Sequence, residues 1–323
     1  MLKTIAAMTF GAFTVSACAP AAAPVAAVGD RAAGRSLAQF GEGEFLESIL
    51  VVDADTLLVS SLQTGRIYRV DRHSGDATIF ATLPAGVAGS LNEGVFCLTR
   101  DGQDGFYVTV FSPNAEIHGI WHVSASGQTR HVVSLPLEMI PNGLARSPGS
   151  HLYVADSAQG GIWKADPSTG QATLWSGSPL LRARTENREY PATNGLQISG
   201  SQVFASVSDT MRIVRVPIRP GGEAGEAEIF ASGIGVDDFA VDPNGVVFAT
   251  THPFNSIERI SADGAITRIA GAAEGVIGPT AAALAQGPDG TRILYVVTDG
   301  GVYAPPAEGV GRAQLLVIDL PQG

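Results

Sequence analysis

One pattern recurs six times along the chain and constrains its fold more than any other feature. A polar residue is followed by an apolar alternation, a turn rich in Gly, Pro and Asn, a second strand and a third strand. In the clearest copy, residues 235–260, Asp237 and Asp238 precede the alternation and residues 243–245 form the turn. The polar residues that open the copies are Glu47, Glu93, Asn142, Asn194, Asp237 and Thr280.

The intervals between these openers match one four-stranded propeller blade each: they are 46, 49, 52, 43 and 43 residues. The sequence therefore predicts an all-β fold, a six-bladed β-propeller. We place the blades at residues 43–84, 88–136, 138–178, 194–232, 234–271 and 276–320. Residues 30–42 are expected to supply an outer strand that closes the ring against residues 315–320, because closure removes an exposed sheet edge.

The domain organisation follows from length and composition. The chain has 323 residues. Its 39 Gly and 19 Pro are spread along the sequence at expected turns and do not concentrate in a linker between two domains. We expect one propeller over residues 37–323. The charged link at residues 179–193 has no apolar periodicity, and we expect it to be a surface loop near the opening of the site.

The first residues are typical of an export signal. Residues 1–17 carry Lys3 and then an apolar run over residues 5–15 that is too short to span a membrane. Residues 15–18, Val-Ser-Ala-Cys, resemble a bacterial lipobox in which Cys18 is lipidated, and residues 18–36 then form a lipidated Cys with a flexible tether. We expect an exported, membrane-anchored lipoprotein at the periplasmic face or cell surface; the alternative is a plain secretory signal.

Charge and cysteine content exclude several classes of partner. The net charge is -11, with 31 acidic against 20 basic residues and no basic run longer than two. Nucleic acid and anionic membrane surfaces are therefore poor partners, and we expect contact with a membrane only through the lipid anchor. After Cys18 only Cys97 remains, so the domain has no internal disulfide, and Cys97 is expected to be a buried, inert thiol. We expect a monomer.

The openers of the innermost strands should converge on the axis of the ring. Carboxylate and amide oxygens gathered at one point are hard ligands that suit Ca²⁺, with other divalent cations possible. Each Asn or Asp could alternatively serve only as a turn former. Five such residues in register are not required by turn chemistry, so we predict a central metal site.

These residues also resemble a known family. Residues 47–48 on the first inner strand, 141–144 (Pro-Asn-Gly-Leu), 194–196, 236–238 and 287–290 match, in order and spacing, the SMP-30/gluconolactonase family of six-bladed propellers over about residues 40–320. The copy at residues 235–260 also resembles the paraoxonases.

The resemblance implies a ligand set and two departures. It implies that the catalytic divalent ion, usually Ca²⁺, is bound by Glu47, Asn142, Asn194 and Asp237, with Asp238 where paraoxonases carry a further ligand. Ile140 stands where sugar-lactone hydrolases of the family carry Arg, which puts gluconolactone in doubt as the substrate. Glu93 stands where paraoxonases carry a His, so their proposed histidine relay is absent.

Metal-assisted hydrolysis of a small-molecule lactone or ester is the function that these residues favour. A carboxylate not fully used by the metal could act as the base, and Glu93 and Asp238 are the candidates. We expect His252 to lie away from the ligands, as a structural histidine, and His118, His122 and His131 to occupy ordinary strand or surface positions. The alternatives are a non-catalytic tethered binding module with a structural ion, and a strictosidine-synthase-like propeller that uses a Glu.

Overall fold

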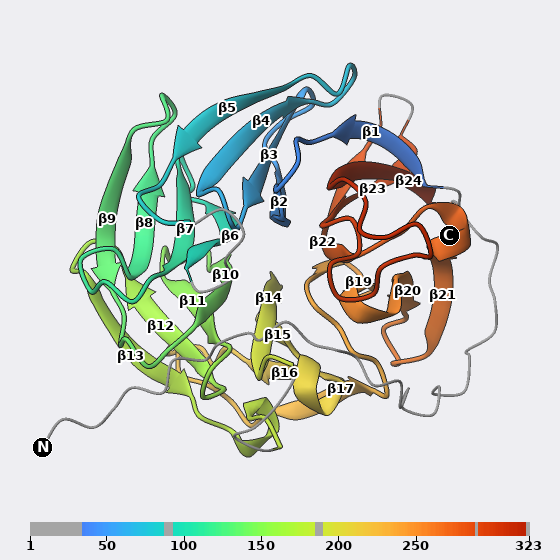
Figure 1. The fold of residues 1–323 in the computed structure, drawn as a ribbon. Helices are drawn as coiled ribbons and strands as arrows, with labels where there is room; N and C mark the ends of the chain where they lie inside the picture. Colours follow the sequence, from blue (N-terminus) through green and yellow to red (C-terminus); the bar gives the residue numbers. More distant parts are fainter. Residues whose placement is uncertain (1–33, 87–92, 185–189, 288–289, 321–323) are drawn as a thin grey trace, which may run out of the picture.

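The computed structural model describes residues 34–86, 93–184, 190–287 and 290–320. Figure 1 shows a closed ring of sheets around a central axis. The predicted leader at residues 1–17, Cys18 and most of the predicted tether lie outside the described residues.

Six four-stranded antiparallel sheets form the ring, as the repeat predicts. Blade 1 contains β2 (Leu46–Val51), β3 (Thr56–Ser61), β4 (Arg66–Asp71) and β5 (Ala77–Thr82). Blade 2 contains β6 (Gly94–Arg100), β7 (Phe106–Phe111), β8 (Gly119–Val123) and β9 (Thr129–Ser134). Blade 3 contains β10 (Pro141–Arg146), β11 (Leu152–Asp156), β12 (Ile162–Asp166) and β13 (Gln171–Ser176).

The remaining three sheets complete the circle. Blade 4 contains β14 (Thr193–Ser199), β15 (Gln202–Val207), β16 (Arg212–Pro217) and β17 (Glu228–Ser232). Blade 5 contains β18 (Phe239–Val241), β19 (Val247–Thr251), β20 (Ser256–Ile260) and β21 (Ile266–Gly271). Blade 6 contains β22 (Pro279–Gln286), β23 (Arg292–Thr298), β24 (Gln314–Leu320) and β1 (Arg35–Gln39).

Blade 6 is built from both ends of the described chain, which confirms the predicted closure. Strand β1 pairs antiparallel with β24, and Arg35 lies opposite Val317. The first described strand therefore begins at Arg35, two residues before the predicted start of the propeller at residue 37. The pairing covers the edge that β24 would otherwise expose.

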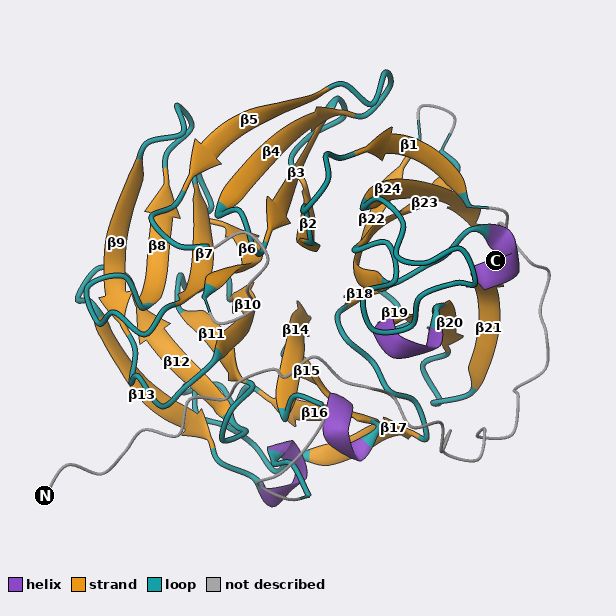
Figure 2. Ribbon diagram, viewed as in Figure 1, coloured by secondary structure: helices purple, strands orange, loops and turns teal. Residues whose placement is uncertain are grey.

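Helical structure is limited to four single 3-10 turns within the described residues (Figure 2): η1 (Pro179–Leu181), η2 (Ser208–Thr210), η3 (His252–Phe254) and η4 (Ala272–Glu274). None of these turns is long enough to cross a membrane.

The hydrophobic core is divided among the six interfaces between neighbouring sheets. Between blades 1 and 2, for example, Leu58 and Ile67 pack with Val95 and Val108 in one buried cluster. Equivalent clusters fill the other five interfaces. Since apolar side chains face the neighbouring blades, the positions at the inner strand ends are free for polar groups.

A β-bulge opens the innermost strand of five blades and places the openers. Register shifts fall at residues 46–48, 95–98, 141–144, 193–196 and 279–281. A bulge adds one residue and re-aims its side chain. The bulges thereby present Glu47, Asn142, Asn194 and Thr280 at one end of the ring.

Hydroxyl groups on second strands brace these bulges from blade to blade. Thr109 Oγ1 accepts the backbone N–H of Cys97 at 3.0 Å in its own blade and donates to the carbonyl of Asn142 at 2.6 Å in the next. In blade 5, Thr250 Oγ1 likewise accepts the backbone N–H of Asp238 at 3.2 Å and donates to the carbonyl of Thr280 in blade 6 at 2.8 Å. Each brace satisfies backbone groups that the bulge leaves without a ladder partner.

Candidate functional site

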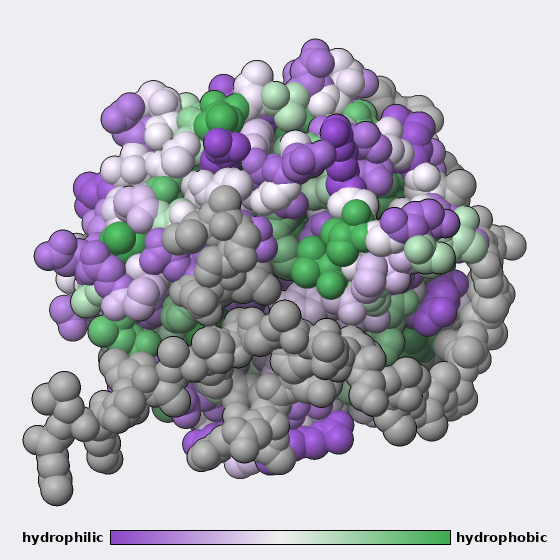
Figure 3. Space-filling view, viewed as in Figure 1, coloured by the Kyte–Doolittle hydropathy of each residue, from purple (hydrophilic) through white to green (hydrophobic). Residues whose placement is uncertain are grey.

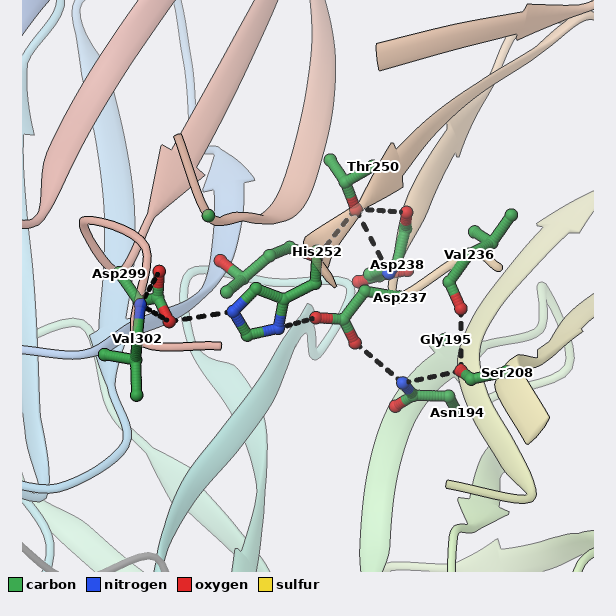
Figure 4. Close-up of polar contacts among 12 residues, drawn as sticks. Asn194, Gly195, Ser208, Val236, Asp237, Asp238, Thr250, His252, Asp299 and Val302 are labelled. Atoms are coloured by element: carbon green, nitrogen blue, oxygen red, sulfur yellow. Dashed lines mark hydrogen bonds and ion pairs between the residues drawn. The ribbon is translucent and has the colours of Figure 1, made fainter. Parts of the chain in front are cut away.

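A hydrogen-bonded chain of side chains lies at the bulged end of the ring, and Figure 4 shows the part of it that runs from Asn194 through Asp237 and His252 to Asp299. Asn142 Nδ2 donates to Asn194 Oδ1 at 2.5 Å, and Asn194 Nδ2 donates to Asp237 Oδ1 at 2.7 Å. Asn194 Nδ2 also donates to Ser208 Oγ at 3.1 Å. Three of the four predicted ligands are therefore in direct contact.

Glu47 is the fourth predicted ligand and is electrostatically coupled to the same group. Burial raises the pKa of Glu47 well above its ordinary value, and the negative charge of Asp237 raises it further. Within the described part of the chain, the Glu47 carboxylate makes no hydrogen bond. The charge of His252 offsets only part of this rise, so the ionised form of the half-buried Glu47 remains costly, and a bound cation would lower that cost.

His252 joins the site, which corrects the expectation that it lies away from the ligands. Its Nδ1 is 3.0 Å from Asp237 Oδ2, and its Nε2 is 2.8 Å from Asp299 Oδ2. Burial opposes a charge on the imidazole, but Asp299 and Asp237 outweigh burial and raise the pKa of His252 to about 10. His252 is therefore a cation held between two carboxylates.

Strand direction explains why the sequence interpretation missed His252 and Asp299. The second strand of a blade runs antiparallel to the first, so its last residue lies beside the start of the first strand. Asp237 N–H accordingly donates to the carbonyl of Thr250 at the end of β19, next to His252. Asp299 follows β23 in the same way. Both residues come directly after the second strand of a blade, and a search of that position in each repeat could have identified them from the sequence.

Asp238 follows Asp237 in the chain and lines the central cavity of the ring. Its Oδ1 accepts the N–H of Phe239 at 2.7 Å, and its other oxygen makes no hydrogen bond within the described chain. Burial raises the pKa of Asp238 to about 7, the Phe239 N–H opposes that rise, and the charge of Asp237 adds to it. The side chain thus sits close to the midpoint between acid and carboxylate at neutral pH.

A central cavity of about 310 Å³ runs below the ring of openers, and Asp238 lines it. The same cavity is also lined by Ser48, Cys97, Leu144, Arg146 and Gln197. Cys97 is buried, as predicted, and burial followed by the charge of Asp238 raises the pKa of its thiol to about 12. A larger hollow of about 790 Å³, beside Asp242 and Arg292, lies at the opposite ends of the inner strands and contains none of the predicted ligands.

Blade 2 does not present Glu93 at the opener position. Its bulge falls between Val95 and Leu98, so Phe96 is the counterpart of Asn142. The brace confirms this register, because Ser60 Oγ donates to the carbonyl of Phe96 at 2.7 Å. Glu93 lies three residues earlier, where its Oε2 accepts from Ser112 Oγ at 3.0 Å and its Oε1 from the N–H of Gly86 at 3.3 Å.

The histidines of blade 2 differ from the expectation in one case. His118 is fully buried in the link between β7 and β8. Its Nδ1 accepts the N–H of Ser112 at 3.3 Å, and its Nε2 donates to the carbonyl of Pro136 at 3.1 Å. Burial lowers the pKa of His118. His118 is therefore a neutral structural residue.

The glycines of the Asn-Gly pairs are required by close approach. A Cβ on Gly143 would lie 2.4 Å from the carbonyl oxygen of Asn194, and a Cβ on Gly195 would lie 2.5 Å from Asp238 Oδ1. Any side chain at these positions would push neighbouring inner strands apart. The pairs therefore keep Asn142, Asn194 and Asp238 around one axis.

The donor set fits a hard divalent cation. Two carboxylates, Glu47 and Asp237, and two amides, Asn142 and Asn194, would supply oxygen ligands from four blades. The Glu47 carboxylate makes no hydrogen bond in the described chain. Calcium takes such mixed oxygen shells. Over the same residues, no three His, Cys, Asp or Glu side chains gather closely enough to hold a metal alone. A cation site here would therefore need the two amide oxygens as well as the carboxylates.

Comparison with known proteins agrees with this architecture. The family model for the SMP-30/gluconolactonase/LRE-like region matches residues 36–300. The chain belongs to this family. The matched residues include the opener ring, His252 and Asp299. A search of curated proteins found no match.

Several solved structures share the fold of this SMP-30/gluconolactonase family member at low identity. A calcium-binding regucalcin from Agrobacterium tumefaciens is 18% identical, with a TM-score of 0.64 over 91% of this chain and 96% of that one. A gluconolactonase from Xanthomonas campestris is 16% identical, with a TM-score of 0.62 over 94% and 99%. A luciferin-regenerating enzyme is 11% identical, with a TM-score of 0.66 over 89% and 95%.

Proposed function

We propose that the protein is a Ca²⁺-dependent hydrolase of lactones or related esters. The observation that carries this proposal is the hydrogen-bonded contact of Asn142, Asn194 and Asp237 at one end of the tunnel. The charge of Asp237 also acts on Glu47, and Asp238 lines the cavity. The family and the regucalcin and gluconolactonase folds support a lactonase-type propeller with a divalent ion.

Each side chain of the site has a role that its contacts support. A bound divalent cation would polarise the substrate carbonyl and stabilise the negative charge that develops on its oxygen. Asn194 and Ser208 orient Asp237 from one side through the 2.7 Å and 3.1 Å hydrogen bonds of the Asn194 amide. His252 holds the other carboxylate oxygen of Asp237, so one oxygen stays directed toward the ring of ligands.

Asp238 is the better candidate for the base that takes a proton from water. It lines the cavity below the ligands, and one of its oxygens has no hydrogen bond within the described residues. Both oxygens of Glu93, in contrast, accept hydrogen bonds, from Ser112 and Gly86. A base must reach the proton that it removes, and its geometry is judged before its pKa.

The test is hydrolysis of δ-valerolactone, γ-butyrolactone and phenyl acetate by the purified propeller with added Ca²⁺ or with EDTA. We expect activity with Ca²⁺ that EDTA abolishes and Ca²⁺ restores. Asp238→Asn should lower kcat by about 10²–10⁴-fold, the usual share of a general base. Calcium binding, followed as a shift in Tm, should persist in this variant. Metal-independent turnover, or full turnover by Asp238→Asn, would contradict the mechanism.

A non-catalytic binding module with a structural ion is the second candidate, because one propeller fold serves both roles. The ligand ring would then stabilise the domain without turning over a substrate. A Ca²⁺-dependent Tm with no hydrolysis of any of the three substrates would favour this reading. We further propose export with lipidation at Cys18, which mass spectrometry of the membrane fraction would test.

A further inference from the structure

An apolar wall borders the ligand ring on the side of blade 6. Val302 and Tyr303, in the loop between β23 and β24, are 41% and 38% exposed. Figure 3 shows hydrophobic surface beside the central hollow over this blade. The ring of Tyr303 packs edge-on against the imidazole of His252, with a centroid distance of 4.9 Å. The exposed apolar residues are thus continuous with the candidate site.

The loop that carries this wall is fixed by a residue of the site itself. Asp299 Oδ1 accepts the N–H of Gly301 at 2.7 Å and of Val302 at 3.3 Å, while Asp299 Oδ2 contacts His252. On the far side of the loop, Asn255 Nδ2 donates to the carbonyl of Ala304 at 3.0 Å. One carboxylate therefore orients both the imidazole and the wall, so Val302 and Tyr303 are held in place before a ligand arrives.

Blades 1 and 2 also place apolar side chains beside the candidate site. Phe45, Leu62 and Phe96 form a buried cluster against which Phe111 and Ile140 pack. Phe45 also packs edge-on against His252, at a centroid distance of 5.7 Å. The imidazole of His252 thus contacts the aromatic rings of Phe45 and Tyr303, and of the apolar-wall and cluster side chains named here only Tyr303 carries a hydrogen-bonding group.

Tyr303 combines this apolar ring with one polar atom. Its hydroxyl makes no hydrogen bond within the described residues. Burial and the charges of Glu47, Asp237 and Asp299 raise its pKa, so the phenol keeps its proton and remains a donor. A polyhydroxylated substrate would find one donor here and would bury its other hydroxyls unpaired, which costs free energy for each group.

We propose that Val302 and Tyr303 are specificity-determining residues that select lactones or esters bearing an apolar alkyl or aryl substituent and disfavour polyhydroxylated lactones. This inference rests on the proposed hydrolase function and names its substrate class. Burial of one methylene against such a wall raises kcat/KM by up to about fourfold.

The experiment compares γ-lactones of increasing side-chain length, from γ-butyrolactone to γ-octalactone, with glucono-δ-lactone in the presence of Ca²⁺. We expect kcat/KM to rise by about two- to fourfold per methylene and to be lowest for glucono-δ-lactone. Val302→Ser and Tyr303→Ser should flatten the slope with chain length. Tyr303→Phe keeps the ring and should keep the slope. Ile229→Ser, at a 50% exposed position on the outer strand β17, is the matched control and should leave the series unchanged.

The outcomes separate the two proposals. A flat series, a preference for glucono-δ-lactone, or an unchanged slope in Val302→Ser and Tyr303→Ser would overturn the specificity while leaving the hydrolase function in place. Failure to hydrolyse any lactone with Ca²⁺ present would overturn the hydrolase function and, with it, the specificity that depends on it.

Discussion

Blades 5 and 2 share one backbone plan and present opposite chemistry at the same end of the ring. In blade 5 the opener is Asp237, and the residue after the second strand is His252, bound to Asp237 and Asp299. In blade 2 the opener is Phe96, and the residue after the second strand is Ser112, bound to Glu93. The hydroxyl brace is nevertheless the same, through Thr250 in one blade and Thr109 in the other. The scaffold therefore fixes positions, and the side chains decide which blades hold a ligand.

The largest expected effect comes from Asp237→Asn in blade 5. This change removes the negative charge of a proposed metal ligand and leaves one acceptor oxygen where Asn194 and His252 now contact two. We expect Ca²⁺ affinity, measured by titration of the Tm shift, to fall by more than about 100-fold, beyond the effect of an outer partner. A wild-type Ca²⁺ response in this variant would remove Asp237 from the ligand set.

His252→Asn should have the next largest effect. The Asn side chain keeps a donor but cannot contact Asp237 and Asp299 at the same time, so the proposed ligand Asp237 is no longer held from both sides. We expect Ca²⁺ affinity and kcat/KM to fall by about 10–100-fold, as is usual for an outer-shell partner. His131→Asn, which changes a histidine on β9 outside the ligand ring, should match the wild type. Equal behaviour of the two variants would show that His252 is only structural.

Glu93→Gln tests the blade 2 side and should change turnover much less. Its contacts with Ser112 and Gly86 can be kept in part by the amide, and it lies outside the opener position. We expect Ca²⁺ binding to persist and kcat to fall by less than about tenfold, below the range of a general base. A loss comparable to that of Asp238→Asn, measured on the same lactone, would return Glu93 to the mechanism.

The smallest effect concerns His118 and folding stability. Its folded pKa lies below the ordinary value of 6.5, so on acidification the unfolded chain binds a proton that the folded chain does not. Stability should therefore fall below about pH 6.5, with a slope of up to about 1.4 kcal/mol per pH unit from this group. Urea unfolding of wild type and His118→Gln at pH 7.5 and 5.5 would measure it. An identical pH dependence in both would contradict a neutral His118.

The sequence predicts the ring, its closure and the contact of Asn142, Asn194 and Asp237, because these depend on repeat spacing. It does not reveal the register of blade 2, since Glu93-Gly94 looks like Asn142-Gly143 until the bulge at Phe96 is seen. His252 and Asp299 were also missed, because they follow second strands and read as ordinary turn residues. Local patterns report strands, whereas bulges and strand polarity decide which side chains meet.

The pairing of β1 with β24 also bears on how the molecule is made. Arg35 is synthesised long before Val317, its partner across the sheet. Strand β1 therefore has no strand to pair with while the ribosome is still producing the other blades. The last blade can be completed only when the two distant segments find each other, a slow, late event with a large loss of chain entropy. Deletion of β24 would leave an open ring with unpaired strand edges, and these edges favour association between copies of the chain.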